Sequence, residues 1–157
     1  MKSFFWSRSG LLFFFLIFIT VSTHAGAYEV RPMILNMIAG RSGEDETITI
    51  SNTTDRAIAL ETVVQKRTKL EDGTEELSPA DEDFIILPPQ VLIEPGKKEN
   101  ISVRWVGGDI GNMKSYYITI RQLPIDSTPQ DNLQGIQLLI NFSVAAYISP
   151  DSGIAGK

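Results

Sequence analysis

The chain has 157 residues, of which 43% are hydrophobic and 21% are charged, with a formal net charge of −5, one histidine and no cysteine. A domain of this length can bury a core without disulfide support. The acidic balance argues against a nucleic-acid partner, because such proteins need a basic face to neutralise phosphates.

The N-terminus has the pattern of a cleaved export signal. Lys2 and Arg8 are followed by an apolar run over residues 11–21 and by the small residues Ala25-Gly26-Ala27. We expect cleavage after Ala27, so that residues 1–27 are a signal peptide and the mature, secreted chain begins at Tyr28. An uncleaved membrane anchor is the alternative, although the run is shorter than the roughly 20 residues that span a bilayer.

Loss of the signal would change the chemistry of the chain. It removes two basic residues and no acidic ones, which takes the formal charge from −5 to −7, and it removes His24, the only histidine. Without His and Cys, zinc sites, cysteine nucleophiles and Ser-His-Asp relays are excluded. Lys114 and Ser115 are adjacent and so point to opposite faces of a strand. We therefore expect no enzyme, no metal, no cofactor and no small-molecule substrate.

Short stretches of period-two alternation, separated by turn residues, predict an all-β chain. Seven such stretches in a domain of this size are typical of a seven-stranded immunoglobulin-like β-sandwich, which we expect as a single domain over residues 28–150. The expected strands are Tyr28–Ile38, Thr47–Asn52, Ile58–Arg67, Phe84–Leu87, Asn100–Val106, Tyr116–Gln122 and Ile136–Ile148.

Three of the segments between the expected strands have sequences that predict their structure. Seven acidic residues fall within Glu71–Asp83, which we interpret as a solvated hairpin connection rather than a calcium site, because the EF-hand spacing is missing. A carboxylate pair for glycoside hydrolysis is the other alternative there. Pro88-Pro89 predicts an interruption of the sheet, because proline donates no backbone hydrogen bond. Glu94-Pro95-Gly96-Lys97 predicts a type II turn.

The last expected strand is the most informative part of the chain. No charged residue occurs between Asn132 and Pro150, and the residues at 136, 138, 140, 142 and 144 are all apolar. Natural sheet edges are blunted by Lys, Pro or bulges, so a long strand without them is either covered or meets another chain.

Four segments in this order resemble the N-terminal domain of the periplasmic chaperones of chaperone-usher pilus assembly. They are Phe84–Gly96 (FIILPPQVLIEPG), Ile101–Trp105 (ISVRW), Tyr117–Pro124 (YITIRQLP) and the long alternating strand. The resemblance implies a periplasmic chaperone whose last strand is lent to a pilus subunit that lacks its own final strand. It also implies pilus or fimbrial subunits and the outer-membrane usher as partners.

Counted back from Pro150, Ile136, Leu138 and Ile140 match the family's donor positions, and Phe142 and Val144 extend the row. We therefore predict the subunit-binding donor strand at Ile136, Leu138, Ile140 and Phe142. The alternative is that these side chains face the domain's own core, which we favour for Phe142 and Val144. Each fully buried aliphatic side chain would contribute roughly 1.5–3 kcal/mol to binding.

The resemblance also implies a basic pair, an Arg on the first strand and a Lys on the last, that holds the terminal carboxylate of the subunit. Those positions hold Ile34 and Ala145, which cannot form charge-assisted hydrogen bonds. Arg31 and Arg121 are the possible basic contacts that the sequence offers instead.

Two further questions concern the extent of the chain and its role. A second domain would begin about where the chain stops, so residues 151–157 are either a linker or the tail of a truncated two-domain chaperone, unless the protein works as one domain. The alternative function is a self-contained structural or adhesive immunoglobulin-like domain, including a pilus subunit. A subunit should show an alternating N-terminal extension, commonly with a cysteine pair, and Tyr28–Ile38 has little of that pattern.

Overall fold

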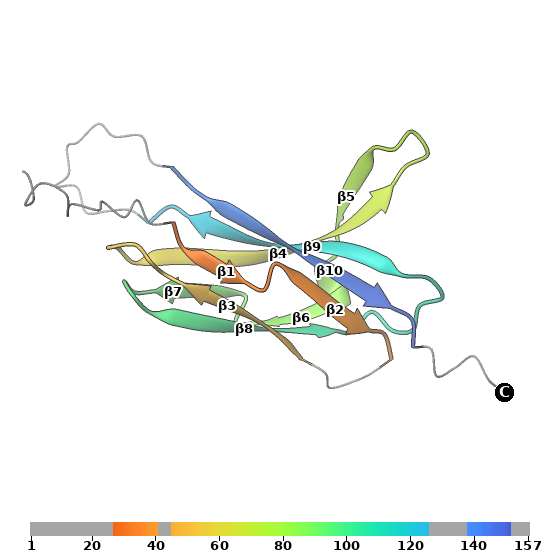
Figure 1. The fold of residues 1–157 in the computed structure, drawn as a ribbon, viewed down its shortest axis with the longest axis horizontal. Helices are drawn as coiled ribbons and strands as arrows, with labels where there is room; N and C mark the ends of the chain where they lie inside the picture. The colour runs from red at the N-terminus through yellow and green to blue at the C-terminus, as the bar shows by residue number, and fades with distance from the viewer. Residues whose placement is uncertain (1–26, 41–44, 126–137, 152–157) are drawn as a thin grey trace, which may run out of the picture.

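The computed structural model describes residues 27–40, 45–125 and 138–151. These residues form two facing β-sheets, as Figure 1 shows. Sheet A has the strand order β1-β3-β8-β6, and sheet B has the order β2-β10-β9-β4-β5, with β7 also paired to β4. The strands are β1 (Glu29–Arg31), β2 (Ile34–Ile38), β3 (Glu46–Ser51), β4 (Ile58–Lys69), β5 (Glu75–Pro79), β6 (Phe84–Leu87), β7 (Gln90–Ile93), β8 (Lys98–Trp105), β9 (Lys114–Leu123) and β10 (Asn141–Ser149), and a short 3-10 helix covers Asp81–Asp83.

The core lies between the two sheets and follows the alternation of the sequence. β8, β9 and β10 each bury three side chains at alternate positions, because successive side chains of a strand point to opposite faces. An aromatic cluster lies in this core: Phe84 packs edge-to-face on Trp105 at 5.2 Å and on Tyr116 at 5.1 Å between ring centroids, and Trp105 and Tyr116 meet in a tilted contact at 5.6 Å. The predicted all-β sandwich is confirmed. No helix in the described ranges is long and apolar enough to cross a membrane.

The expected first strand, Tyr28–Ile38, is divided between the two sheets. β1 pairs with β3 in sheet A, the peptide bond from Arg31 to Pro32 is cis, and β2 then pairs with β10 in sheet B. Proline has no N–H group to donate to a ladder, so one continuous strand could not run through this position. β2 runs parallel to β10, with Ile34 opposite Ala145 and Ile38 opposite Ser149.

The acidic stretch Glu71–Asp83 belongs to an exposed hairpin connection, as predicted, and also contains a strand that was not predicted. This strand, β5, forms a hairpin with β4 that projects from the sandwich (Figure 1). Every β5 side chain is exposed, so no apolar face marked it in the sequence. The Asp81 carboxylate accepts a hydrogen bond from the Val64 N–H at 3.0 Å and so continues the β4 edge beyond β5.

The two turn predictions are confirmed. Pro88-Pro89 separates β6 in sheet A from β7, which pairs with β4 in sheet B. In the turn that follows, Gly96 has φ +70° and the Lys97 N–H donates to the Glu94 carbonyl at 3.1 Å. The positive φ is the reason that glycine is needed there.

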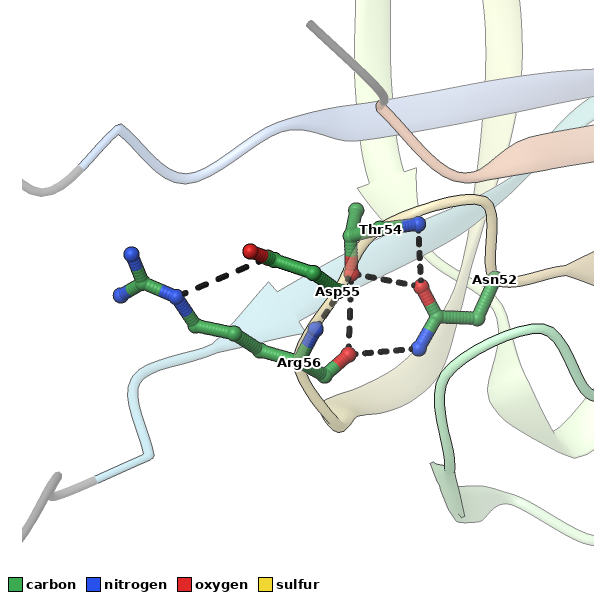
Figure 2. Close-up of polar contacts among 4 residues, drawn as sticks. All are labelled: Asn52, Thr54, Asp55 and Arg56. Carbon is green, nitrogen blue, oxygen red and sulfur yellow. Dashed lines mark hydrogen bonds and ion pairs between the residues drawn. The ribbon is translucent and has the colours of Figure 1, made fainter. Parts of the chain in front are cut away.

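Asn52 holds the turn after β3 and is the buried polar side chain of the described core. Its amide nitrogen donates to the carbonyls of Arg56 at 2.7 Å and Ile93 at 2.9 Å. Its side-chain oxygen accepts from the Thr54 N–H at 2.9 Å and the Thr54 hydroxyl at 2.7 Å, and Figure 2 shows the part of this network within the turn. All the hydrogen-bonding capacity of the Asn52 amide is therefore used to fix the turn.

Candidate functional site

The two sides of β10 have different partners. On one side β10 pairs with β9 from Asn141 to Ile148, but on the other side β2 begins only opposite Ala145. The Ala145 N–H donates to the Met33 carbonyl at 3.0 Å and marks the start of that second ladder. Within the described residues, the strand residues 141–144 therefore have a strand neighbour on one side only, and residues 138–140 precede them outside any strand. We call Leu138–Val144 the open segment.

β10 begins later than predicted, at Asn141. The three residues before it, 138–140, have no regular secondary structure. At this point the side chains of three residues form hydrogen bonds with backbone groups, in place of the backbone–backbone hydrogen bonds of the ladder. The Asn141 side chain accepts from the Gln122 N–H at 3.1 Å, and the Gln122 side chain accepts from the Ile140 N–H at 3.2 Å. The Tyr28 hydroxyl donates to the Ile140 carbonyl at 2.8 Å. These contacts end the β9–β10 ladder.

Tyr28 is itself buried, and its hydroxyl also lies 3.1 Å from the Ile120 carbonyl. Its ring packs against Phe142 in a T-shaped contact with 4.9 Å between centroids. Burial raises the pKa of the Tyr28 hydroxyl to about 12, because the phenolate would lose its hydration there. Tyr28 therefore joins the first described residues to the start of β10.

The side chains of the alternating apolar row become progressively more buried from the start to the end of the open segment. Leu138 is 75% exposed, Ile140 and Phe142 are half-buried against the core, and Val144 is fully buried. Ile136 lies outside the described residues. Whether the exposed members of this row enter a partner stays a prediction.

The basic residues predicted as contacts are already paired with carboxylates. Arg31 is exposed on sheet A and lies 3.7 Å from Glu29. Arg121 lies opposite Asn141 on sheet B, and its Nη2 donates to Glu61 at 2.7 Å. The structure therefore does not bring these two arginines together.

The two positions where the resemblance implies a basic pair do lie together. Ile34 and Ala145 are register partners in the β2–β10 ladder. Ile34 is 56% exposed. The position is therefore accessible, but its side chains are apolar.

Sequence reasoning missed one cation on the outer face of sheet B. The Arg67 guanidinium carbon lies 4.3 Å from the centre of the Tyr117 ring, and Nη2 lies 2.5 Å from Glu75. Glu75 chiefly, with Tyr147 and Tyr117, raises the pKa of Arg67, so the side chain stays charged. The alternation of β4 places Arg67 on the same face as Val63 and Gln65. This alternation was the only feature of the local sequence that indicated the orientation of Arg67.

The fold is shared with solved structures of pilus chaperones. A chain of the CsuC–CsuE chaperone–tip adhesion subunit complex of Acinetobacter baumannii aligns with a TM-score of 0.63 and 13% identity, over 80% of this chain and 58% of that chain. A chain of the Salmonella enterica SafA pilin–SafB chaperone complex aligns at 0.62 and 20% identity, over 83% and 58%. The E. coli chaperone DraB aligns at 0.60 and 18% identity, over 80% and 55%.

These likenesses define the class of the domain as a pilus-chaperone immunoglobulin-like fold. Residues 34–153 match the family described as the pili and flagellar-assembly chaperone, PapD N-terminal domain, and the chain belongs to that family. The family is one of assembly chaperones and not of enzymes, as the sequence predicted. No curated protein sequence matches the chain. The chain spans between 55% and 58% of the length of the three solved chaperone chains.

Proposed function

We propose that this protein is a periplasmic chaperone that binds pilus subunits and stabilises them by lending the open segment as a strand. One observation carries the proposal: β10 has a strand neighbour on one side only until β2 begins opposite Ala145. An incoming strand could continue sheet B along that side, and strand addition to an exposed edge is a known way for a sheet to bind a peptide.

The backbone of the open segment is suited to this role. Successive residues of a strand aim their N–H and C=O groups to opposite sides, and the Ala145 N–H is directed to β2. Ser143 and Asn141 therefore aim their backbone groups to the same side, where the described residues supply no strand. These groups would form the ladder with the subunit.

The side chains supply the apolar part of the contact. Leu138 gains most from a partner, because three-quarters of its surface is still exposed. Ile140 has less surface left to bury, and Ile136 is proposed to extend the row outside the described residues. Full burial of one such side chain stabilises a complex by roughly 1.5–3 kcal/mol. We further propose the outer-membrane usher as a second partner, and Arg31 and Arg121 as secondary basic contacts.

Co-purification tests the proposal. The protein is coexpressed in the periplasm with a pilus subunit from the same gene cluster, and the Leu138→Glu variant is compared with the wild type. A charge at this position would have to be buried against the subunit, so recovery of the subunit should fall at least tenfold for a cost of about 1.4 kcal/mol or more.

Leu87→Glu is the matched control, because Leu87 is 60% exposed on β6 in the other sheet. It introduces the same charge at a leucine of similar exposure and should leave recovery unchanged. Equal recovery of the subunit with wild type and Leu138→Glu would refute the donor role of the open segment.

A further inference from the structure

The residue pair that would continue the β9–β10 ladder before Asn141 is joined through side chains. The ladder pairs Asn141 with Arg121, so the next pair in the same register is Ile140 with Gln122. The Gln122 N–H donates to the Asn141 side-chain oxygen at 3.1 Å, and the Ile140 N–H donates to the Gln122 side-chain oxygen at 3.2 Å. Each strand thus supplies one side-chain acceptor for a backbone N–H of the other chain segment.

Ile140 is held at three points. Its N–H is bound by Gln122, its carbonyl accepts from the Tyr28 hydroxyl at 2.8 Å, and its side chain packs against the core. The same hydroxyl lies 3.1 Å from the Ile120 carbonyl of β9, so Tyr28 reaches both sides of the ladder at its end. Ile140 is therefore fixed relative to β9 although it lies outside β10.

A proline explains why backbone groups do not continue the ladder. Pro124 follows the end of β9, and in the same register it would lie opposite Leu138. Proline has no N–H group, so Pro124 cannot donate to the Leu138 carbonyl. Leu138 is 75% exposed and Leu139 is 40% exposed. The position of these two leucines therefore depends on how the residue after them, Ile140, is held.

Holding this stretch in place before a partner arrives has an energetic consequence. Fixing the backbone of one flexible residue costs about 1–2 kcal/mol of conformational entropy. A segment that is already restrained in the free protein avoids this cost on binding, which raises affinity. One hydrogen bond of this kind contributes about 0.5–1.5 kcal/mol, so the two side-chain bonds together are of the size needed to restrain a residue.

We propose that Gln122 and Asn141 are positioning residues for the open segment. Their side-chain amides hold Ile140 in line with β9, so that Leu138 projects to where the partner strand arrives. The inference rests on the proposed function, because it needs a strand on the open segment. The two amides act through Ile140 and not by their own contact with the subunit.

The experiment uses coexpression with a pilus subunit from the same gene cluster. Gln122→Met and Asn141→Leu each remove one acceptor and keep a side chain of similar size. Each should lower recovery of the subunit about two- to tenfold, the range that corresponds to one lost hydrogen bond. Asn141→Asp keeps an acceptor oxygen and should restore recovery. The proposal is overturned if both acceptor-free variants recover as much subunit as the wild type, or if Asn141→Asp recovers no more than Asn141→Leu.

Asn100→Leu is the matched control for Asn141→Leu. Asn100 lies on β8 in the other sheet, and its exposed side chain also has one hydrogen bond, with Thr49. The same substitution there should leave recovery unchanged. An equal fall for the two variants would mean that the loss is not specific to the open segment, and would overturn the proposal.

A double-mutant cycle separates positioning from a general effect on the fold. Leu138→Ala should lower recovery about tenfold in the wild-type protein, because the buried part of the leucine is lost. In the Gln122→Met background the same change should cost only about threefold, because Leu138 is no longer held in place. A purely structural role of Gln122 would make the two factors equal. If Gln122→Met does not fold, Asn141→Leu serves as the background.

The cycle also distinguishes the two levels of the argument. If Leu138→Ala and Leu138→Glu both leave recovery unchanged, the proposed function itself fails, and the positioning role fails with it. If both lower recovery, but Leu138→Ala costs as much in the Gln122→Met background as in the wild type, the donor role stands and the positioning role does not.

Discussion

Tyr28 offers a quantitative test of how the start of β10 is held. Its pKa is raised from 10.0 to about 12 in the folded protein, so the folded state holds the hydroxyl proton more tightly than the unfolded state. The stability that this proton contributes is fully present below pH 10 and is lost as the pH rises to about 12. At pH 11 the loss of stability from this group should be about 1.4 kcal/mol, because pH 11 lies one pH unit above the pKa of tyrosine in the unfolded state and one below that in the folded state.

The assay is urea unfolding of the wild type and Tyr28→Phe at pH 8 and pH 11. At pH 8 the variant should be less stable by about 1 kcal/mol, because the Ile140 carbonyl loses its donor while the ring contact with Phe142 is kept. Between pH 8 and pH 11 the variant should lose about 1.4 kcal/mol less than the wild type. Tyr116, whose pKa burial also raises, is present in both proteins and cancels. An equal loss of stability in the two proteins would refute the reasoning.

Two further predictions concern the loops. Asn52→Ala should lower the free energy of unfolding by about 3 kcal/mol in urea, because four hydrogen bonds are lost in a buried turn, whereas Asn100→Ala, which loses one exposed bond, should cost less than about 1 kcal/mol. A similar cost for both would contradict the role of the Asn52 network. Gly40→Ala should cost about 1–3 kcal/mol by thermal unfolding, because Gly40 has φ +80° and an added Cβ would lie 2.7 Å from the Asp109 carboxylate. Gly111→Ala meets no atom within 4 Å and is the control, and an equal shift in melting temperature would exclude the proposed strain.

Alternation alone located most of the sandwich. The expected strand Phe84–Leu87 coincides with β6, and β3, β4, β8 and β9 differ from expectation by two residues or fewer at each end. These strands bury one face, so their apolar residues recur with the period that the pleat imposes. The fold class was therefore accessible from local pattern.

The division of the first strand and the presence of β5 could not be predicted from alternation. The sequence treats Tyr28–Ile38 as one strand, but the sheet that each half joins depends on pairing with β3 and β10, which are distant along the chain. β5 carries no apolar face and forms because β4 extends to Lys69 and offers it a ladder. Long-range pairing decided both cases.

The candidate site was only partly accessible from sequence. The exposed Leu138 lies where the alternating row predicted it, and its role in binding stays a prediction, as does that of Ile136. Arg67 was not among the site residues predicted from the sequence. Its position is defined by Tyr117 and Tyr147, which belong to strands that meet β4 only in the folded sheet.

The crossing of the first strand from one layer to the other has a consequence for how such proteins could diversify. Pro32 lies just before the start of β2, and the start of β2 sets how many residues of β10 would be available to the proposed partner strand. Moving the crossing two residues later would lengthen the available stretch by about 6.6 Å without altering a single contact side chain. The length of β10 open to the proposed partner strand thus depends on residues before β2, whereas the side chains of the contact lie in the open segment. Selection could change either one without the other.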